Sequence, residues 1–175
     1  MTINIIVPCY NEQEVLPWAV EHLQQVVAQI DSELHIATRL LFVDDGSRDT
    51  TWQLIEQTAE KYDNVEGLKL AHNVGHQNAL WAGMNESIGK CDAMVSIDAD
   101  LQDDPFAIVD MARQFVEGKD IVYGVRRERK ADTWFKRVSA LGFYRVMRAV
   151  DKEIVYNHAD FRLMSARAAE ALMQY

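Results

Sequence analysis

Short aliphatic runs alternate with longer amphipathic stretches along most of the chain, and this alternation limits the possible folds more than any other feature. Five short runs that contain β-branched residues are typical of strands: 3–8, 39–44, 65–70, 93–98 and 120–125. Four stretches between them have the apolar spacing of helices: 12–30, 49–62, 76–88 and 105–117. Because these strands are apolar on both faces and are separated by helices, we predict an α/β fold with a Rossmann-like, mainly parallel sheet flanked by helices.

The length of 175 residues predicts a single domain over 1–175, large enough to bury a core. No run of about 18 apolar residues occurs in the sequence, so none of it reads as a membrane span. The two cysteines, Cys9 and Cys91, are too few for a disulfide scaffold, and no Cys/His pair has the spacing of a zinc site. We therefore expect two free thiols.

Charge is distributed unevenly along the chain. The net charge is −9, yet residues 126–148 hold eight Lys/Arg against two acids, an excess of +6 that leaves −15 for the remainder. An acidic protein is a poor general binder of nucleic acid, so no nucleic-acid partner is expected. A segregated basic segment predicts an anionic partner instead, and a membrane surface or a lipid phosphate suits it. The alternative is a packed helix whose Lys/Arg face is only solvated.

Polar residues follow four of the predicted strands, in the stretches VPCYNE, VDDGSRDT, HNVGHQNA and SIDADLQDDP. In parallel sheets ligands bind beyond the carboxyl ends of the strands, so these stretches predict a site at one edge of the sheet. Each stretch taken alone is also typical of an ordinary turn, because turns use Asn, Asp and Gly. The occurrence of polar residues at all four strand ends favours a binding site.

The acidic stretch after the fourth strand divides into two parts. In an extended segment residues i and i+2 face the same way, so Asp98 and Asp100 can face one site, with the Gln102 carbonyl next to them. Two carboxylates suit Mg²⁺ or Mn²⁺ when a nucleotide supplies the remaining oxygen ligands. Asp103 and Asp104 stand where a helix should begin and are expected to cap it, as Asp49 should cap the helix at 49–62.

Other ligand motifs fit the sequence poorly. The loop that starts at Asp98 lacks the glycine and glutamate of an EF-hand, and neither a P-loop nor GxGxxG is present. Phosphates must then be held by a metal together with basic side chains. Four histidines show no ligand spacing and are expected to be surface or hydrogen-bonding residues: His22, His35, His76 and His158.

Taken in order, six segments resemble the family-2 glycosyltransferases of GT-A fold: IIVPCYNE, VDDGSRDTT, NVGHQNAL, SIDADLQDDP, YGVRRERKADTWFKR and DFRLMS. The resemblance covers essentially the whole chain and is strongest to the polyprenyl-phosphate branch, which contains dolichol-phosphate mannosyltransferases and bactoprenol glucosyltransferases. Two departures are visible, since His72 and Ala159 stand where the family usually has Arg and Gly.

The resemblance implies a role for each of a set of residues. The nucleotide would be surrounded by Pro8, Tyr10, Glu12, Asp44, Asp45 and Asp98. The metal and the donor diphosphate would be held by Asp98, Asp100 and Gln102. The acceptor and its phosphate would be met by Arg126, Lys136, Arg137 and Arg162. The catalytic candidates are Asp100, Asp160 and Arg126.

The implied reaction is a metal-dependent, inverting transfer of a hexose from a nucleotide diphosphate sugar (UDP-glucose-like or GDP-mannose-like) to a polyprenyl monophosphate. It would take place at the cytoplasmic face of the cell membrane, and a homo-oligomer is left open. Two alternatives remain: transfer to a glycan hydroxyl, for which Asp160 would be the base, or a donor-binding fragment that is inactive without a missing C-terminal segment. Members of this branch continue into transmembrane helices, so we expect the chain to be truncated before them, at Tyr175.

Overall fold

The computed structural model describes residues 1–125 and 158–174. Along the described chain the elements are β1 (Thr2–Cys9), α1 (Leu16–Leu34), β2 (Ala37–Asp44), α2 (Thr51–Lys61), β3 (Val65–Lys69), α3 (His76–Ser87), β4 (Ala93–Ser96), α4 (Ala107–Val116), β5 (Ile121–Val125), β6 (His158–Ser165) and α6 (Ala166–Leu172). The five predicted strands and four predicted helices are all present.

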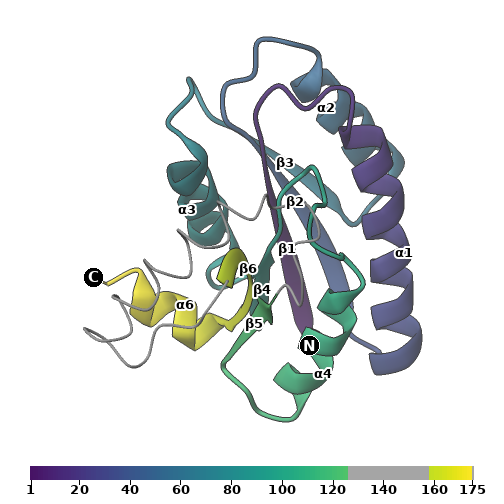
Figure 1. Ribbon diagram of the computed structural model, residues 1–175, viewed down its shortest axis with the longest axis vertical. Coiled ribbons are helices and arrows are strands. Elements are labelled where there is room, and N and C mark those ends of the chain that lie inside the picture. Colours follow the sequence, from purple (N-terminus) through teal and green to yellow (C-terminus); the bar gives the residue numbers. More distant parts are fainter. Residues whose placement is uncertain (126–157, 175) are drawn as a thin grey trace, which may run out of the picture.

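The strands form one six-stranded sheet in the order β3-β2-β1-β4-β6-β5 (Figure 1). The pairs from β3 to β4 are parallel, whereas β6 runs antiparallel to both β4 and β5. The predicted α/β class with a mainly parallel sheet is therefore confirmed. The strand β6 and the helix α6 are additions that the alternation of strands and helices did not predict.

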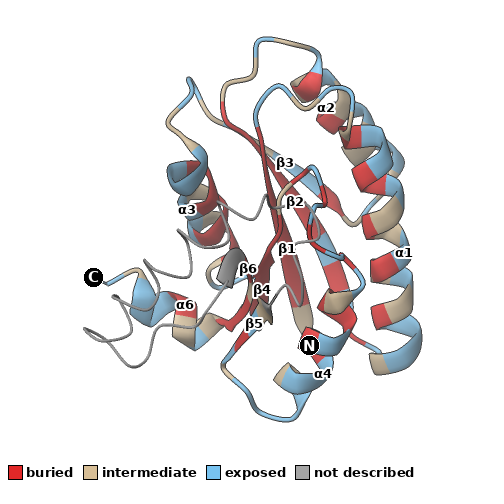
Figure 2. Ribbon diagram, in the orientation of Figure 1, coloured by how far each residue is buried: buried red, intermediate tan, exposed pale blue. Residues whose placement is uncertain are grey.

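Helices cover both faces of the sheet, as Figure 1 shows. One buried cluster joins the sheet to α1, α2 and α4, and it contains alternate residues of β1 such as Ile5. The other cluster joins the opposite face to α3 and α6 and contains Ile6. Buried residues accordingly line the inner sides of the helices and nearly all of the central strands (Figure 2). This packing makes the central strands a rigid base for the loops at their carboxyl ends.

The ends of the helices are set by local hydrogen bonds. Helix α1 starts at Leu16 rather than at residue 12, because residues 12–15 form a turn in which the Glu12 carbonyl accepts the backbone N–H groups of Val15 and Leu16. The Asp49 carboxylate accepts the N–H of Thr51, the first residue of α2, at 2.9 Å, although Thr50 and not Asp49 stands at the N-cap position of this helix. Asp104 accepts the N–H of Phe106, just before α4, at 3.0 Å.

Both thiols are free, as expected from the sequence. Burial, together with the nearby charges of Glu12 and Asp44, raises the pKa of Cys9 far above its usual range. Burial also raises the pKa of Cys91, to about 11. Within the described part of the chain, no helix combines the length and the apolar character needed to cross a membrane.

Candidate functional site

A cavity of about 290 Å³ lies beyond the carboxyl ends of β1 and β4, beside the first turn of α3. Residues from four loops line it, and six of them are residues that the sequence assigned to nucleotide or metal: Pro8, Tyr10, Glu12, Asp45, Asp98 and Asp100. The sheet therefore brings together residues that are up to 92 positions apart in the sequence.

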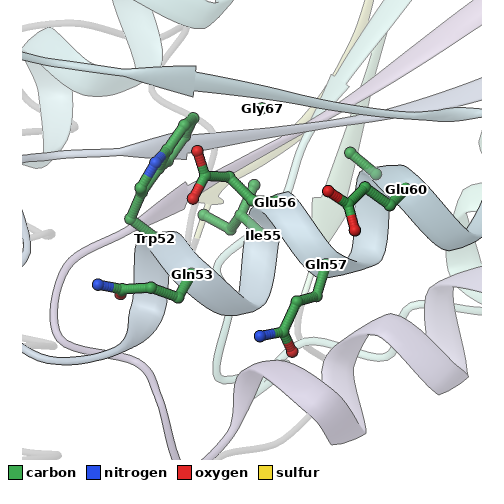
Figure 3. Close-up of a pocket in the computed structure, with 8 residues that line it drawn as sticks. Trp52, Gln53, Ile55, Glu56, Gln57, Glu60 and Gly67 are labelled. Atoms are coloured by element: carbon green, nitrogen blue, oxygen red, sulfur yellow. The ribbon is translucent and has the colours of Figure 1, made fainter.

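No predicted site residue lines the larger cavity, of about 660 Å³, beside α2 and β3. Figure 3 shows Trp52 and Glu56 of α2 directed toward the strand that carries Gly67 in that second cavity.

The loop after β1 and the loop after β2 are joined by reciprocal hydrogen bonds. The backbone N–H of Asn11 donates to Ser47 Oγ at 2.9 Å, and the Asn11 side-chain oxygen accepts the N–H of Arg48 at 2.9 Å. The N–H of Glu12 donates to Thr51 Oγ1 at 2.8 Å. Asn11 has a left-handed backbone with φ of 57°, a conformation that Asn tolerates better than most residues. Together the two loops form one wall of the cavity.

The neighbouring carboxylates Asp44 and Asp45 have different surroundings. Asp44 is fully buried, and one of its oxygens accepts the N–H of Ser47 at 3.2 Å. Its other oxygen has no hydrogen-bond partner among the described residues. Asp45 lines the cavity and accepts the backbone N–H groups of Val74 and Gly75 at 2.7 and 3.0 Å. Asp45 thus holds the turn that leads into α3.

That turn places a histidine in the cavity. Gly75 has φ of 90°, and His76 follows it as the first residue of α3. His76 Nε2 lies 3.5 Å from Asp98 Oδ1, and both residues line the cavity. From the sequence, His76 was expected to be a surface or hydrogen-bonding residue with no part in the site. Its position directly after a glycine turn, at the carboxyl edge of the sheet, is the signal that could have identified it.

The cavity is strongly acidic. Burial raises the pKa of Glu12 above its ordinary value, and the charges of Asp100, Asp49 and Asp98 raise it further. Carboxylates that share one cavity disfavour one another's ionised forms, because their negative charges repel. A cation bound among them would relieve this repulsion.

Two of these carboxylates suit a divalent cation. Asp98 and Asp100 both line the cavity. The Asp100 carboxylate accepts the backbone N–H of Gln102 at 3.2 Å and its side-chain Nε2 at 2.8 Å, so the Gln102 amide orients this carboxylate. Among the described residues no group of three His, Cys, Asp or Glu side chains is placed to hold a metal by itself. The residues therefore fit Mg²⁺ or Mn²⁺ only if water and a phosphate-bearing ligand supply the remaining oxygens.

The residues assigned to the acceptor are only partly described. Arg126, Lys136 and Arg137 lie outside the described residues. Asp160 belongs to β6, but its side chain lies outside the described part. Arg162 is paired across the sheet with Ser96 of β4 and Tyr123 of β5, and its buried Nε–H has no partner among the described residues. Arg162 thus stands beside the strand that leads to Asp98, but it is not among the residues that line the acidic cavity.

Comparison with known proteins places the chain in a family. Residues 4–173 match the model of the family described as Glycosyl transferase family 2. The Bacillus subtilis (strain 168) protein named "Uncharacterized glycosyltransferase YkoT" is 51% identical over 175 residues, which cover 99% of this chain and 52% of that protein. The Escherichia coli (strain K12) protein named "Prophage bactoprenol glucosyl transferase homolog" is 32% identical over 171 residues, which cover 97% of this chain and 54% of that protein. The chain therefore spans about half the length of these curated relatives.

A solved structure supports the same fold. The mannosyltransferase PcManGT from Pyrobaculum calidifontis, solved with GDP-Man and Mn²⁺, matches with a TM-score of 0.66 at 18% identity, over 97% of this chain and 46% of that one. The expected GT-A fold is thereby confirmed, and the bactoprenol relative confirms the resemblance to the polyprenyl-phosphate branch. With the family match running from residue 4 to residue 173, this chain belongs to glycosyl transferase family 2.

Proposed function

We propose that this chain carries the donor site of a metal-dependent hexosyltransferase that moves a sugar from a nucleotide diphosphate sugar to a polyprenyl monophosphate, with inversion at the anomeric carbon. The observation that carries the proposal is the convergence of Glu12, Asp98 and Asp100 in one cavity at the carboxyl edge of the sheet. The printed names of the relatives support the substrate classes, because one is a bactoprenol glucosyl transferase homolog and PcManGT was solved with GDP-Man.

The nucleotide end of the donor fits the wall formed by the two joined loops. Tyr10 is 40% exposed at the rim of the cavity and offers an aromatic face to a base. Asp44, which the sequence also assigned to the nucleotide, is fully buried behind this wall and does not line the cavity. Asp45 keeps the opposite side of the cavity in place through Val74 and Gly75.

The diphosphate of the donor would reach Asp98 and Asp100 through a bound metal ion. Asp98 and Asp100 would hold Mg²⁺ or Mn²⁺, which supplies positive charge to the diphosphate as it leaves. PcManGT was solved with Mn²⁺, which supports this choice of ion. Gln102 contributes by orienting Asp100 rather than by lining the cavity.

The acceptor end needs positive charge more than it needs a base. A phosphate monoester has a second pKa of about 6, so it is largely dianionic at neutral pH and is already a nucleophile. The Arg162 Nε–H, buried and without a described partner, suits one phosphate oxygen. We expect Arg126, Lys136 and Arg137 to complete the phosphate site. The basic segment at 126–148 would bring this side of the protein to the cytoplasmic face of the membrane.

Two alternatives make different predictions. A glycan hydroxyl as acceptor would need a carboxylate base, and Asp160 is the candidate. The second alternative is a fragment that only binds the donor. The test is to supply labelled UDP-glucose and GDP-mannose with Mn²⁺ and either a short-chain prenyl phosphate or a glycan. Sugar on the prenyl phosphate supports the proposal, and sugar on the glycan supports the first alternative. Donor binding without transfer or hydrolysis supports the fragment.

A further inference from the structure

We propose that His76 is a positioning residue that fixes the Asp98 carboxylate for cation binding at the donor site, an inference that rests on the proposed function. His76 Nε2 lies 3.5 Å from Asp98 Oδ1, and the two side chains come from different elements. Asp98 follows β4, whereas His76 opens α3. Both remain partly accessible, with side chains 42% and 49% exposed, so the contact lies at the cavity surface, where a ligand can reach it.

The imidazole has a rigid support. The backbone N–H groups of the preceding turn, including that of Gly75, donate to the buried carboxylate of Asp45. Helix α3 then packs closely on the sheet, since an added Cβ at Gly83 would stand 2.5 Å from Ile6 Cγ2. The backbone of His76 is therefore fixed by the turn and by the packing of α3, and this position of the helix places the imidazole near Asp98.

Asp98 needs such a partner because of its neighbours. Asp100 and Glu12 lie in the same cavity, and the charge of Asp98 contributes to the raised pKa of Glu12. A partly exposed carboxylate among like charges is stabilised by rotating away from them. An imidazole with its proton on Nε2, facing one oxygen of Asp98, favours the rotamer that faces the cavity. Partners of this kind behind a metal ligand change metal affinity by about 10–100-fold when they are removed.

Three variants separate this role from direct contact with the nucleotide. His76→Ala removes the imidazole, and His76→Gln keeps an N–H donor at a similar reach. His35→Asn is the matched control, because His35 is an exposed histidine at the far end of α1 with a left-handed backbone that Asn tolerates. Free Mn²⁺ is measured by electron paramagnetic resonance with UDP present, and UDP binding is measured by calorimetry with and without Mn²⁺.

We expect His76→Ala to weaken Mn²⁺ binding about tenfold, while metal-free UDP binding changes less than twofold. His76→Gln should recover most of the loss, and His35→Asn should match the parent protein. In an Asp98→Asn background His76→Ala should have no further effect, because the partner it positions is already changed. This double-mutant cycle of His76 and Asp98 uses only variants whose thermal midpoint shows that they are folded. The test therefore still decides the question if one single variant is unstable.

The outcomes that overturn the inference are distinct from those that overturn the proposed function. Unchanged Mn²⁺ affinity in His76→Ala shows that His76 does not position Asp98. An equal loss of metal-free UDP binding in both His76 variants shows that the histidine touches the nucleotide instead. If the parent protein itself binds no UDP with Mn²⁺, the proposed donor site fails, and the inference falls with it.

Discussion

The backbone N–H of Gly75 donates to Asp45 Oδ2 at 3.0 Å, and this bond ties the turn after β2 to the first turn of α3. Asp45 is almost fully buried although it lines the cavity, and its other oxygen accepts the N–H of Val74. The residue that the sequence assigned to the nucleotide base therefore also holds the shape of the cavity. Its substitution should affect both stability and binding.

Asp45→Ala should lower the free energy of unfolding by about 2–4 kcal/mol, because two backbone donors lose a charged acceptor. If Asp45 lies at the nucleotide and not at the hexose, as the proposed function has it, binding of free UDP and of a UDP-sugar should weaken to the same extent. Urea denaturation and calorimetry measure the two effects, with Asp63→Ala as an exposed control. If only the binding of the sugar nucleotide weakens, Asp45 contacts the hexose and not the nucleotide.

Gly46→Ala should destabilise the protein far more than Gly89→Ala. Both glycines have positive φ, of 67° and 74°, so an added side chain strains the backbone at both positions. Only at Gly46 would the new Cβ meet backbone atoms, at 2.6 Å from Asn73 N and from the His72 carbonyl carbon, whereas Gly89 has nothing within 4 Å. We expect a loss of about 1 kcal/mol for Gly89→Ala and a clearly larger loss for Gly46→Ala in thermal or urea unfolding. Equal losses would mean that the loop moves to admit the methyl group.

Asp100→Asn should remove most of the stabilisation that UDP-type ligands give in the presence of Mn²⁺ or Mg²⁺. A neutral amide is a poorer ligand for a hard cation, and stabilisation by a ligand follows its affinity for the native state. Without ligand the variant should be no less stable than the parent, because it relieves repulsion with Glu12. A thermal-shift series with and without metal measures both effects, and an undiminished metal-dependent shift would remove Asp100 from the metal site.

Glu12→Gln should stabilise the ligand-free protein at neutral pH. The pKa of Glu12 is raised in the folded state, first by burial and then by Asp100, so the native state holds its proton to higher pH than the unfolded state. Stability therefore falls as the pH rises from the ordinary value of 4.5 through the raised value, and the cost is complete above it. The gain of the variant over the parent should shrink toward zero as the pH falls below that window. Urea unfolding at several pH values checks the sign, and a gain that grew on acidification would contradict it.

Reversing Lys136 and Arg137 to Glu should abolish transfer to prenyl phosphate and leave metal-dependent UDP binding near that of the parent protein. The parent should bind anionic liposomes at low salt and lose them as salt rises, because each basic residue near the surface contributes about 1 kcal/mol. Sedimentation with liposomes measures this binding. If liposome binding is absent at low salt, the glycan acceptor is favoured. If the double variant unfolds, the segment is needed for the stability of the fold.

Much of the fold could be predicted because β1, β2 and β4 are mostly buried and apolar and helical stretches separate the strands up to β5. β6 escaped prediction for a physical reason. Its sequence, HADFRLMS, mixes charged and apolar residues, and nothing local shows that a strand after the basic segment returns between β4 and β5. Pairing of strands distant in sequence is decided by tertiary packing, here the burial of Leu163 in the same cluster as Val95 of β4.

The site was predicted where side chains follow strands, and it was incomplete where helices contribute. The shared position of Asp98 and Asp100 in one cavity could be predicted because the i, i+2 spacing of a strand end is visible in the sequence. His76 was judged by the spacing between histidines, which does not report that α3 begins beside Asp98. The contacts of Asp45 with Val74 and Gly75 could not be predicted for the same reason, since these two residues reach it only through the tertiary fold.

The placement of β6 between β4 and β5 also sets an order of assembly. As the chain leaves the ribosome, β1 to β4 can pair with one another, whereas β5 has no neighbour in the described sheet until residues 158–165 arrive. Until then the apolar edge of β4 stays open, and an open strand edge is a route to aggregation. Pairing across so long a separation is slow because the loop must close first. A nascent chain that stalls within the basic segment would therefore carry most of the acidic cavity on an unfinished sheet.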